Sequence, residues 1–195
     1  IGCNWPVEVD ETYIGGKTRG EGRGIHHKTI VVGAVEVRTK VAKGGKRPMY
    51  AGRLRLRVVK DRGAKALEAF VTGSVEPHSH IVTDGWVGYD GLHTLDYDHQ
   101  PVVLDGDPEK AEQALPMIHL VFSNLKAWIL GTHHGVSPQH LQAYLNEFVF
   151  RFNRRFHPMT AFNSVLGLAA RVKAPTYEAL YGGKWAHPNQ DNHCL

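Results

Sequence analysis

The chain has 195 residues, of which 42% are hydrophobic, with 23 Lys and Arg against 19 Asp and Glu. This length and apolar content predict one domain of ordinary size with a buried core, and they exclude wholesale disorder. No apolar run approaches the roughly 20 residues that a bilayer span needs. Two cysteines, Cys3 and Cys194, are too few for a disulfide framework or a thiolate zinc cluster. The formal charge of +4 fits a polyanionic partner without requiring one.

Strand patterns dominate the first half of the chain. Val7–Ile14 alternates apolar and polar residues, and Thr29–Val37 is apolar enough for a central strand. Arg53–Lys60 alternates again, with arginines on one face and Leu or Val on the other. The next expected elements are a helix, a short strand that ends at the turn pair Asp84-Gly85, and a fifth strand: Ala64–Val71, His80–Thr83 and Tyr97–Leu104.

Beyond Pro116 the pattern becomes helical. The expected helices are Ile118–Leu130, Pro138–Phe156 with Ser137 as its N-cap, Ala161–Ala169 and Tyr177–Tyr181. The order of elements predicts an α/β fold, a mixed sheet flanked by helices with a helical C-terminal third.

Charge is distributed unevenly along the chain. Arg38–Arg62 holds ten Lys or Arg and one acid, whereas Asp84–Glu112 holds eight acids and one base. Either run alone is typical of a solvated surface. Together they favour a protein that handles phosphates, because basic residues attract nucleic acid, while clustered carboxylates repel phosphate unless a divalent cation lies between them.

Asp10 and Asp84 are the candidate catalytic acids. Asp10 is central in the first expected strand, and Asp84 closes the fourth. If these strands are neighbours, both carboxylates can face one cleft, as two-metal phosphoryl transfer requires. An ordinary Asp-Gly turn and a solvent-facing strand Asp would explain the same residues without any catalysis.

Local motifs extend this interpretation. Val9–Lys17 (VDETYIGGK) resembles the opening strand of one group of DDE insertion-sequence transposases, and the resemblance continues through Thr83–Gly85, Phe122–Val136 (FSNLKAWILGTHHGV) and His140–Arg155 (HLQAYLNEFVFRFNRR). It covers most of the chain, roughly residues 7–162. It implies a ribonuclease H-like catalytic domain, for which we expect the boundaries 1–170, followed by a C-terminal tail at 171–195.

The resemblance also implies site residues. Asp10 and Asp84 match the first two metal-binding acids, and the third acid is expected about 35 residues after the second, with a basic residue seven positions later. Those positions hold His119 and Lys126, so His stands where the family has Glu. The implied metal is Mg²⁺ or Mn²⁺, and Mn²⁺ tolerates a nitrogen ligand better.

Three explanations for His119 stay open. It can be a working ligand; the third ligand can instead be Asn124 or Glu112; or this copy has lost its activity. A lone helical His is also commonly a core or surface residue with no role in a site.

Residues expected to contact DNA come from the basic glycine-rich loop, from Lys126, from the His-His segment and from the arginine-rich end of the long helix. They are Lys17, Arg19, Arg23, Lys126, His133, His134, Arg151, Arg154 and Arg155. A zinc site at His133, His134 and His140 is disfavoured, because adjacent histidines diverge and no thiolate is near. Tyr144, Phe148 and Phe152 recur every four residues and indicate packing rather than base stacking.

The resemblance thus implies a DNA transposase that cleaves element ends and transfers the freed 3′-hydroxyl to target DNA. DNA, both element ends and target, is the expected partner, with a homo-oligomer assembled on it and no membrane. A cytoplasmic, nucleoid-associated bacterial or archaeal protein follows. The alternatives are a catalytically inert DNA-binding remnant and a ribonuclease H-like nuclease. Because such transposases carry an N-terminal recognition segment and six residues precede the first strand here, we expect specific end recognition to need a further segment.

Overall fold

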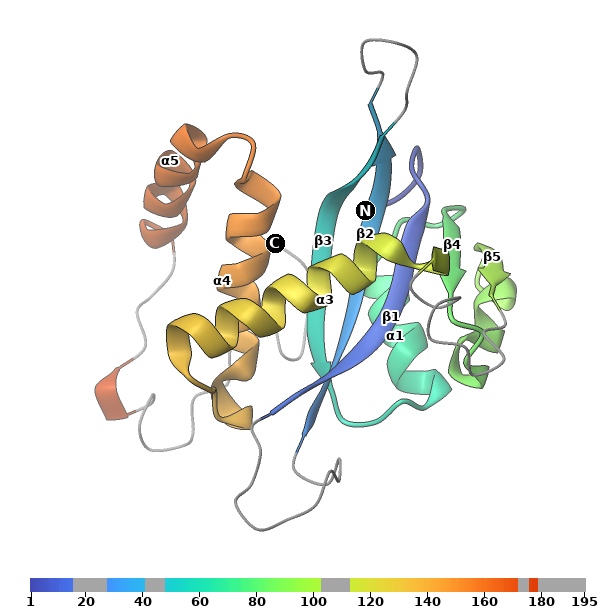
Figure 1. Cartoon of the computed structure of the whole chain (residues 1–195), viewed down its shortest axis with the longest axis horizontal. Helices are drawn as coiled ribbons and strands as arrows, with labels where there is room; N and C mark the ends of the chain where they lie inside the picture. Colours follow the sequence, from blue (N-terminus) through green and yellow to red (C-terminus); the bar gives the residue numbers. More distant parts are fainter. Residues whose placement is uncertain (16–27, 41–47, 103–112, 172–175, 179–195) are drawn as a thin grey trace.

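A five-stranded mixed sheet forms the centre of the molecule (Figure 1). The computed structural model describes residues 1–15, 28–40, 48–102, 113–171 and 176–178. Neighbouring strands follow the order β3-β2-β1-β4-β5, antiparallel among β1, β2 and β3, with β4 parallel to both β1 and β5. The strands are β1 (Val7–Ile14), β2 (Thr29–Thr39), β3 (Met49–Val59), β4 (His80–Thr83) and β5 (Asp98–Pro101). The expected mixed α/β sheet is confirmed, and its order agrees with a ribonuclease H-like fold.

Helices cover both faces of this sheet. Helix α1 (Ala64–Ser74) and the 3₁₀ helix η1 (Val87–Thr94) bury apolar side chains against one face, in a cluster that includes Val7 and Val9 of β1. Helices α3 (Pro116–Trp128) and α4 (Leu141–Arg154) cover the other face, and Figure 1 shows α3 crossing it. Residues alternate along β1, so Glu8 and Asp10 point toward α3.

Close approach of α3 to the sheet depends on Gly33 in β2. Gly33 pairs with Asp10 of β1. A Cβ atom at this position would lie 2.9 Å from the Phe122 ring and 3.0 Å from Ile118. A larger residue would therefore lift α3 away from the strand that carries Asp10.

Helix α4 covers β3, the edge strand of the sheet. The side chain of Asn153 accepts a hydrogen bond from the Leu54 N–H at 2.8 Å and donates to the Leu54 carbonyl at 3.1 Å. Three helical turns earlier, Gln142 accepts from the Val58 N–H at 2.9 Å. These amides occupy backbone groups that a sixth strand would otherwise use, so α4 blocks the exposed edge.

Some expected boundaries differ from those observed. β3 begins at Met49 rather than Arg53, because its ladder with β2 continues past a bulge to pair Thr39 with Met49. The expected helix 138–156 divides into the 3₁₀ helix η3 (Pro138–His140) and α4, and Ser137 makes no side-chain cap. The expected strand 97–104 ends at Pro101, with residues 103 and 104 outside the described chain.

The C-terminal elements also shift. Helix α3 ends at Trp128 and continues as a π-helical turn, η2 (Ile129–His133). Helix α5 begins at Pro158, since proline suits the first helical turn, and runs to Ala169 beside α4 (Figure 1). Of the last expected helix, Tyr177 and Glu178 are helical and the rest lies outside the described residues. Among the described helices, none is long and apolar enough to span a membrane.

Candidate metal centre

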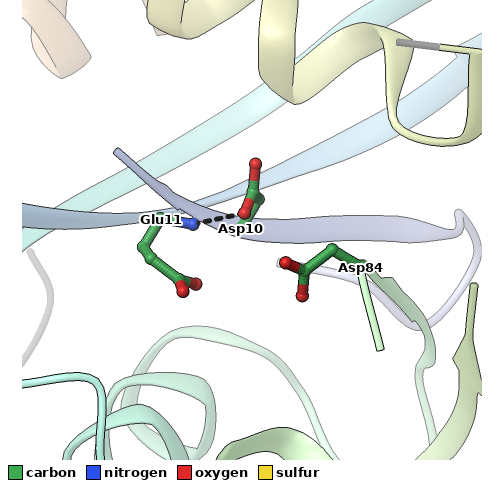
Figure 2. A group of neighbouring side chains, drawn as sticks. All are labelled: Asp10, Glu11 and Asp84. Atoms are coloured by element: carbon green, nitrogen blue, oxygen red, sulfur yellow. Dashed lines mark hydrogen bonds between the residues drawn. The ribbon is translucent and has the colours of Figure 1, made fainter. Parts of the chain in front are cut away.

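The fold brings Asp10 and Asp84 together. Asp10 lies in the middle of β1, and Asp84 follows the last residue of β4, the parallel neighbour of β1. Ligand oxygens of Asp10, Glu11 and Asp84 all lie within 4.8 Å of one another. Figure 2 shows the Glu11 and Asp84 carboxylates on one side of β1 and the Asp10 side chain on the other. β1 and β4 are therefore neighbours, as the expected cleft between Asp10 and Asp84 requires.

His119 approaches Asp10 from α3. Its Nε2 atom lies 3.1 Å from Oδ2 of Asp10, and both side chains are partly buried. Of the other two candidates for the third ligand, Asn124 is exposed and lines an apolar groove between α3 and α4 instead. Glu112 lies outside the described residues. Of the described candidates, His119 is the one that contacts Asp10.

Lys126 lies two turns beyond His119 on α3. Partial desolvation lowers the pKa of its ammonium group, and repulsion from Lys28 lowers it further, while Asp10 acts in the opposite direction. Lys126 is thus within electrostatic range of Asp10. Its side chain is exposed, so a phosphate can reach it.

Glu11 is a member of the acidic group that the sequence did not single out. On the face of the sheet covered by α1 and η1, the Tyr89 hydroxyl of η1 donates to the Glu11 carboxylate at 2.7 Å, and Arg62, just before α1, forms an ion pair with it. Burial raises the pKa of Glu11 despite these two partners. Strand alternation placed Glu11 on the face opposite Asp10. β4 ends at Thr83 and pairs with β1 through Val7 and Glu8, so among the described residues no β4 partner continues past Glu8 to Asp10 and Glu11.

Glu8 is a second acid that sequence reasoning missed. Its side chain is 4% exposed, and its Oε2 atom accepts a hydrogen bond from the Ile118 N–H at 2.8 Å. Burial raises the pKa of Glu8 to about 7, while hydrogen bonds from the backbone of Ile118 and Met117 act against the rise. Glu8 occupies an ordinary polar position in the alternating pattern of β1, so the sequence carried no signal that this side chain is buried.

The electrostatics of the centre favour a cation. Burial also raises the pKa of Asp84, and the neighbouring Asp10 raises it further, although the Trp86 N–H donates to its carboxylate at 3.1 Å. A raised pKa means that the ionised carboxylate is insufficiently stabilised by its surroundings, and a bound cation would supply the missing stabilisation. Carboxylate oxygens are the hard ligands that Mg²⁺ and Mn²⁺ prefer. The donor set therefore fits a divalent metal ion, which in this geometry supports phosphoryl-transfer chemistry.

The residues expected to contact DNA have varied surroundings. Lys17, Arg19 and Arg23 lie outside the described residues. The His133 ring packs edge-on against Trp128 and Tyr144, with centroids 4.8 and 4.6 Å away, whereas His134 is exposed. Within the described chain, the acidic group is the one set of three or more potential ligands close enough to share an ion, so a zinc site at these histidines gains no support.

The three arginines at the end of α4 differ in how free their side chains are to bind phosphate. Arg151 is exposed and pairs with Glu147 at 3.2 Å, and Arg154 lies over the Phe150 ring at 3.9 Å. Arg155 donates to the carbonyl oxygens of Phe152, at 2.7 Å, and Ala51. These contacts tie Arg155 to the end of β3, which leaves Arg151 and Arg154 as the freer candidates for phosphate contact.

Comparison with known proteins assigns the family. No curated protein and no solved structure is significantly similar to the chain. A family model described as the ISXO2-like transposase domain matches residues 4–153. The match spans β1 through α4 and so includes Asp10, Asp84, His119 and Lys126. With its ribonuclease H-like sheet and acidic centre, the chain belongs to the ISXO2-like transposase domain family.

Proposed function

We propose that this protein catalyses metal-dependent cleavage of DNA at element ends and transfer of the resulting 3′-hydroxyl into target DNA. The observation that carries the proposal is the proximity of Asp10 in β1 and Asp84 after β4, together with His119 of α3, which contacts Asp10. These are the positions at which the family resemblance places the two acids and the third ligand. The residues 1–170 form the proposed catalytic domain.

Each residue has a distinct proposed role. Asp10 and Asp84 hold Mg²⁺ or Mn²⁺ through carboxylate oxygens, and a bound ion of this kind polarises the attacking oxygen and stabilises the leaving oxygen of an in-line displacement. His119 is the proposed third ligand, because its Nε2 atom lies beside Asp10. Lys126 binds a DNA phosphate near the same centre. Arg62 and Tyr89 hold the Glu11 carboxylate in place beside both aspartates.

DNA binding outside this centre is assigned to further basic residues. Arg151 and Arg154 lie in the last turn of α4, His134 follows η2, and Lys17, Arg19 and Arg23 belong to the basic, glycine-rich stretch of the sequence. We propose that the protein assembles as a homo-oligomer on DNA, because two element ends must be held at once. A cytoplasmic, nucleoid-associated location follows from this substrate.

A strand-transfer assay tests the proposal. Pre-cleaved DNA ends and a supercoiled target plasmid are incubated with the protein and Mg²⁺ or Mn²⁺, and joined products are separated on a gel. Asp10→Asn and Asp84→Asn should abolish joining, whereas the control Asp98→Asn should retain it, since Asp98 is an exposed acid paired with His80 away from the centre. Joining that persists in both site variants would refute the assignment. Cleavage without joining would favour the nuclease instead.

A catalytically inert DNA-binding remnant is the second candidate. It is favoured by one observation, the imidazole of His119 at the position where the family has a carboxylate. Calorimetry separates the candidates, since the enzyme should bind Mn²⁺ with an affinity that Asp84→Asn removes. DNA binding in the absence of any measurable Mn²⁺ binding would support the remnant.

A further inference from the structure

The first turn of α3 obtains its cap from a distant strand. A helix begins with N–H groups that have no partner within the helix and must find acceptors elsewhere. The residue at the N-cap of α3 is Leu115, which makes no side-chain cap, and Pro116 follows it. Glu8 of β1 supplies an acceptor, because its carboxylate receives the Ile118 N–H at 2.8 Å.

Two acids of β1 contact two consecutive residues of α3. Glu8 and Asp10 are two positions apart, so they share the face of the strand that α3 covers. Glu8 binds the backbone of Ile118, and Asp10 contacts the imidazole of His119 at 3.1 Å. The hydrogen bond to Ile118 is therefore made one residue before His119, whose side chain contacts Asp10.

We propose that Glu8 is a positioning residue that fixes the start of α3 against β1, and thereby sets where His119 meets Asp10 and where Lys126 faces the centre. The effect of this positioning on metal binding rests on the proposed function. The hydrogen bond from Ile118 to Glu8 does not depend on that function. Apolar contacts of Val121, Phe122 and Leu125 also hold α3 on the sheet. Such contacts are not directional, whereas a hydrogen bond constrains both distance and angle, so Glu8 selects one placement of the helix.

Two substitutions of similar size separate positioning from simple packing. Glu8→Gln keeps an oxygen that can accept the Ile118 N–H, while Glu8→Met fills the same space without a comparable acceptor. Leu125→Ala is the control, because Leu125 is fully buried on α3 and its truncation weakens the helix contact away from Glu8. If Glu8→Met does not fold, Glu8→Asp replaces it, since its shorter side chain withdraws the acceptor.

The first readout is the ¹⁵N and ¹H spectrum of the His119 ring in the metal-free protein, identified by its loss in His119→Gln. Glu8→Met should displace the His119 ring signals, and Glu8→Gln and Leu125→Ala should leave them close to wild type. The second readout is Mn²⁺ affinity measured by electron paramagnetic resonance. Glu8→Met should weaken it by about tenfold, as loss of groups that support metal ligands commonly does, and Glu8→Gln should restore most of it.

Unchanged His119 signals in Glu8→Met would overturn the inference, as would an equal displacement in Leu125→Ala, which would show a general loss of packing. The two proposals fail differently. A wild-type protein that binds no Mn²⁺ and joins no DNA would refute the proposed function. In that case the His119 ring signals of Glu8→Met would still test whether Glu8 positions α3.

Discussion

Glu8→Gln should remove the part of the pH dependence of the free energy of unfolding that comes from the Glu8 carboxyl group. Burial raises the pKa of Glu8 to about 7 in the folded chain, against an ordinary value of 4.5. The folded protein therefore holds this proton longer than the unfolded chain does, so the free energy of unfolding falls as the pH rises from 4.5 through about 7. The loss amounts to about 3 kcal/mol, since each pH unit between the two values is worth about 1.4 kcal/mol.

Urea unfolding of the metal-free proteins between pH 4 and pH 8.5 measures this effect. Glu11 and Asp84 also have raised pKa values and contribute to the total slope. The difference between Glu8→Gln and wild type isolates Glu8. The two proteins should have similar stability near pH 4, and the variant should be more stable by about 3 kcal/mol at pH 8.5. Parallel stability curves across this range would refute the argument that Glu8 is buried without a compensating positive charge.

Three further perturbations test the fold and the DNA contacts. Gly33→Ala should destabilise the protein by about 1–3 kcal/mol in urea unfolding, because its Cβ would crowd Phe122; an unchanged midpoint would contradict this close approach. Asn153→Ala should cost about 1–3 kcal/mol by leaving Leu54 backbone groups unpaired, and light scattering should detect greater self-association through the uncovered edge. Arg151→Gln with Arg154→Gln should lower the slope of log affinity for DNA against log salt by about 0.9 for each phosphate that these side chains neutralise, and an unaltered slope would exclude both arginines from phosphate binding.

The acidic centre was largely predictable from the chain. Asp10 and Asp84 could be selected because one is central in an expected strand and the other ends an expected strand, so both carboxylates could face one cleft. His119 followed from the motif spacing. Glu8 and Glu11 flank Asp10 and were missed. Their burial depends on which strands and helices cover β1, and local alternation assigns a face without indicating what packs against it.

The arginine-rich end of α4 illustrates the opposite case. Asn153, Arg154 and Arg155 are adjacent and suggested one basic surface for phosphate. In the folded chain Asn153 and Arg155 bind backbone groups of β3, and Arg154 lies over an aromatic ring. Composition indicates charge, but only the helix orientation shows which side chains point to the edge strand.

By itself, the sequence determined the mixed α/β class, most strand and helix positions, and the resemblance that the family comparison confirmed. These properties follow from short-range periodicity and motifs, which each segment carries on its own. Tertiary structure decided that Glu8 caps α3, that Glu11 joins the two aspartates, and that α4 covers the edge of the sheet. Those contacts join residues up to 110 positions apart. They exist only because parallel pairing of β1 with β4 and the docking of α3 over Gly33 bring the segments together.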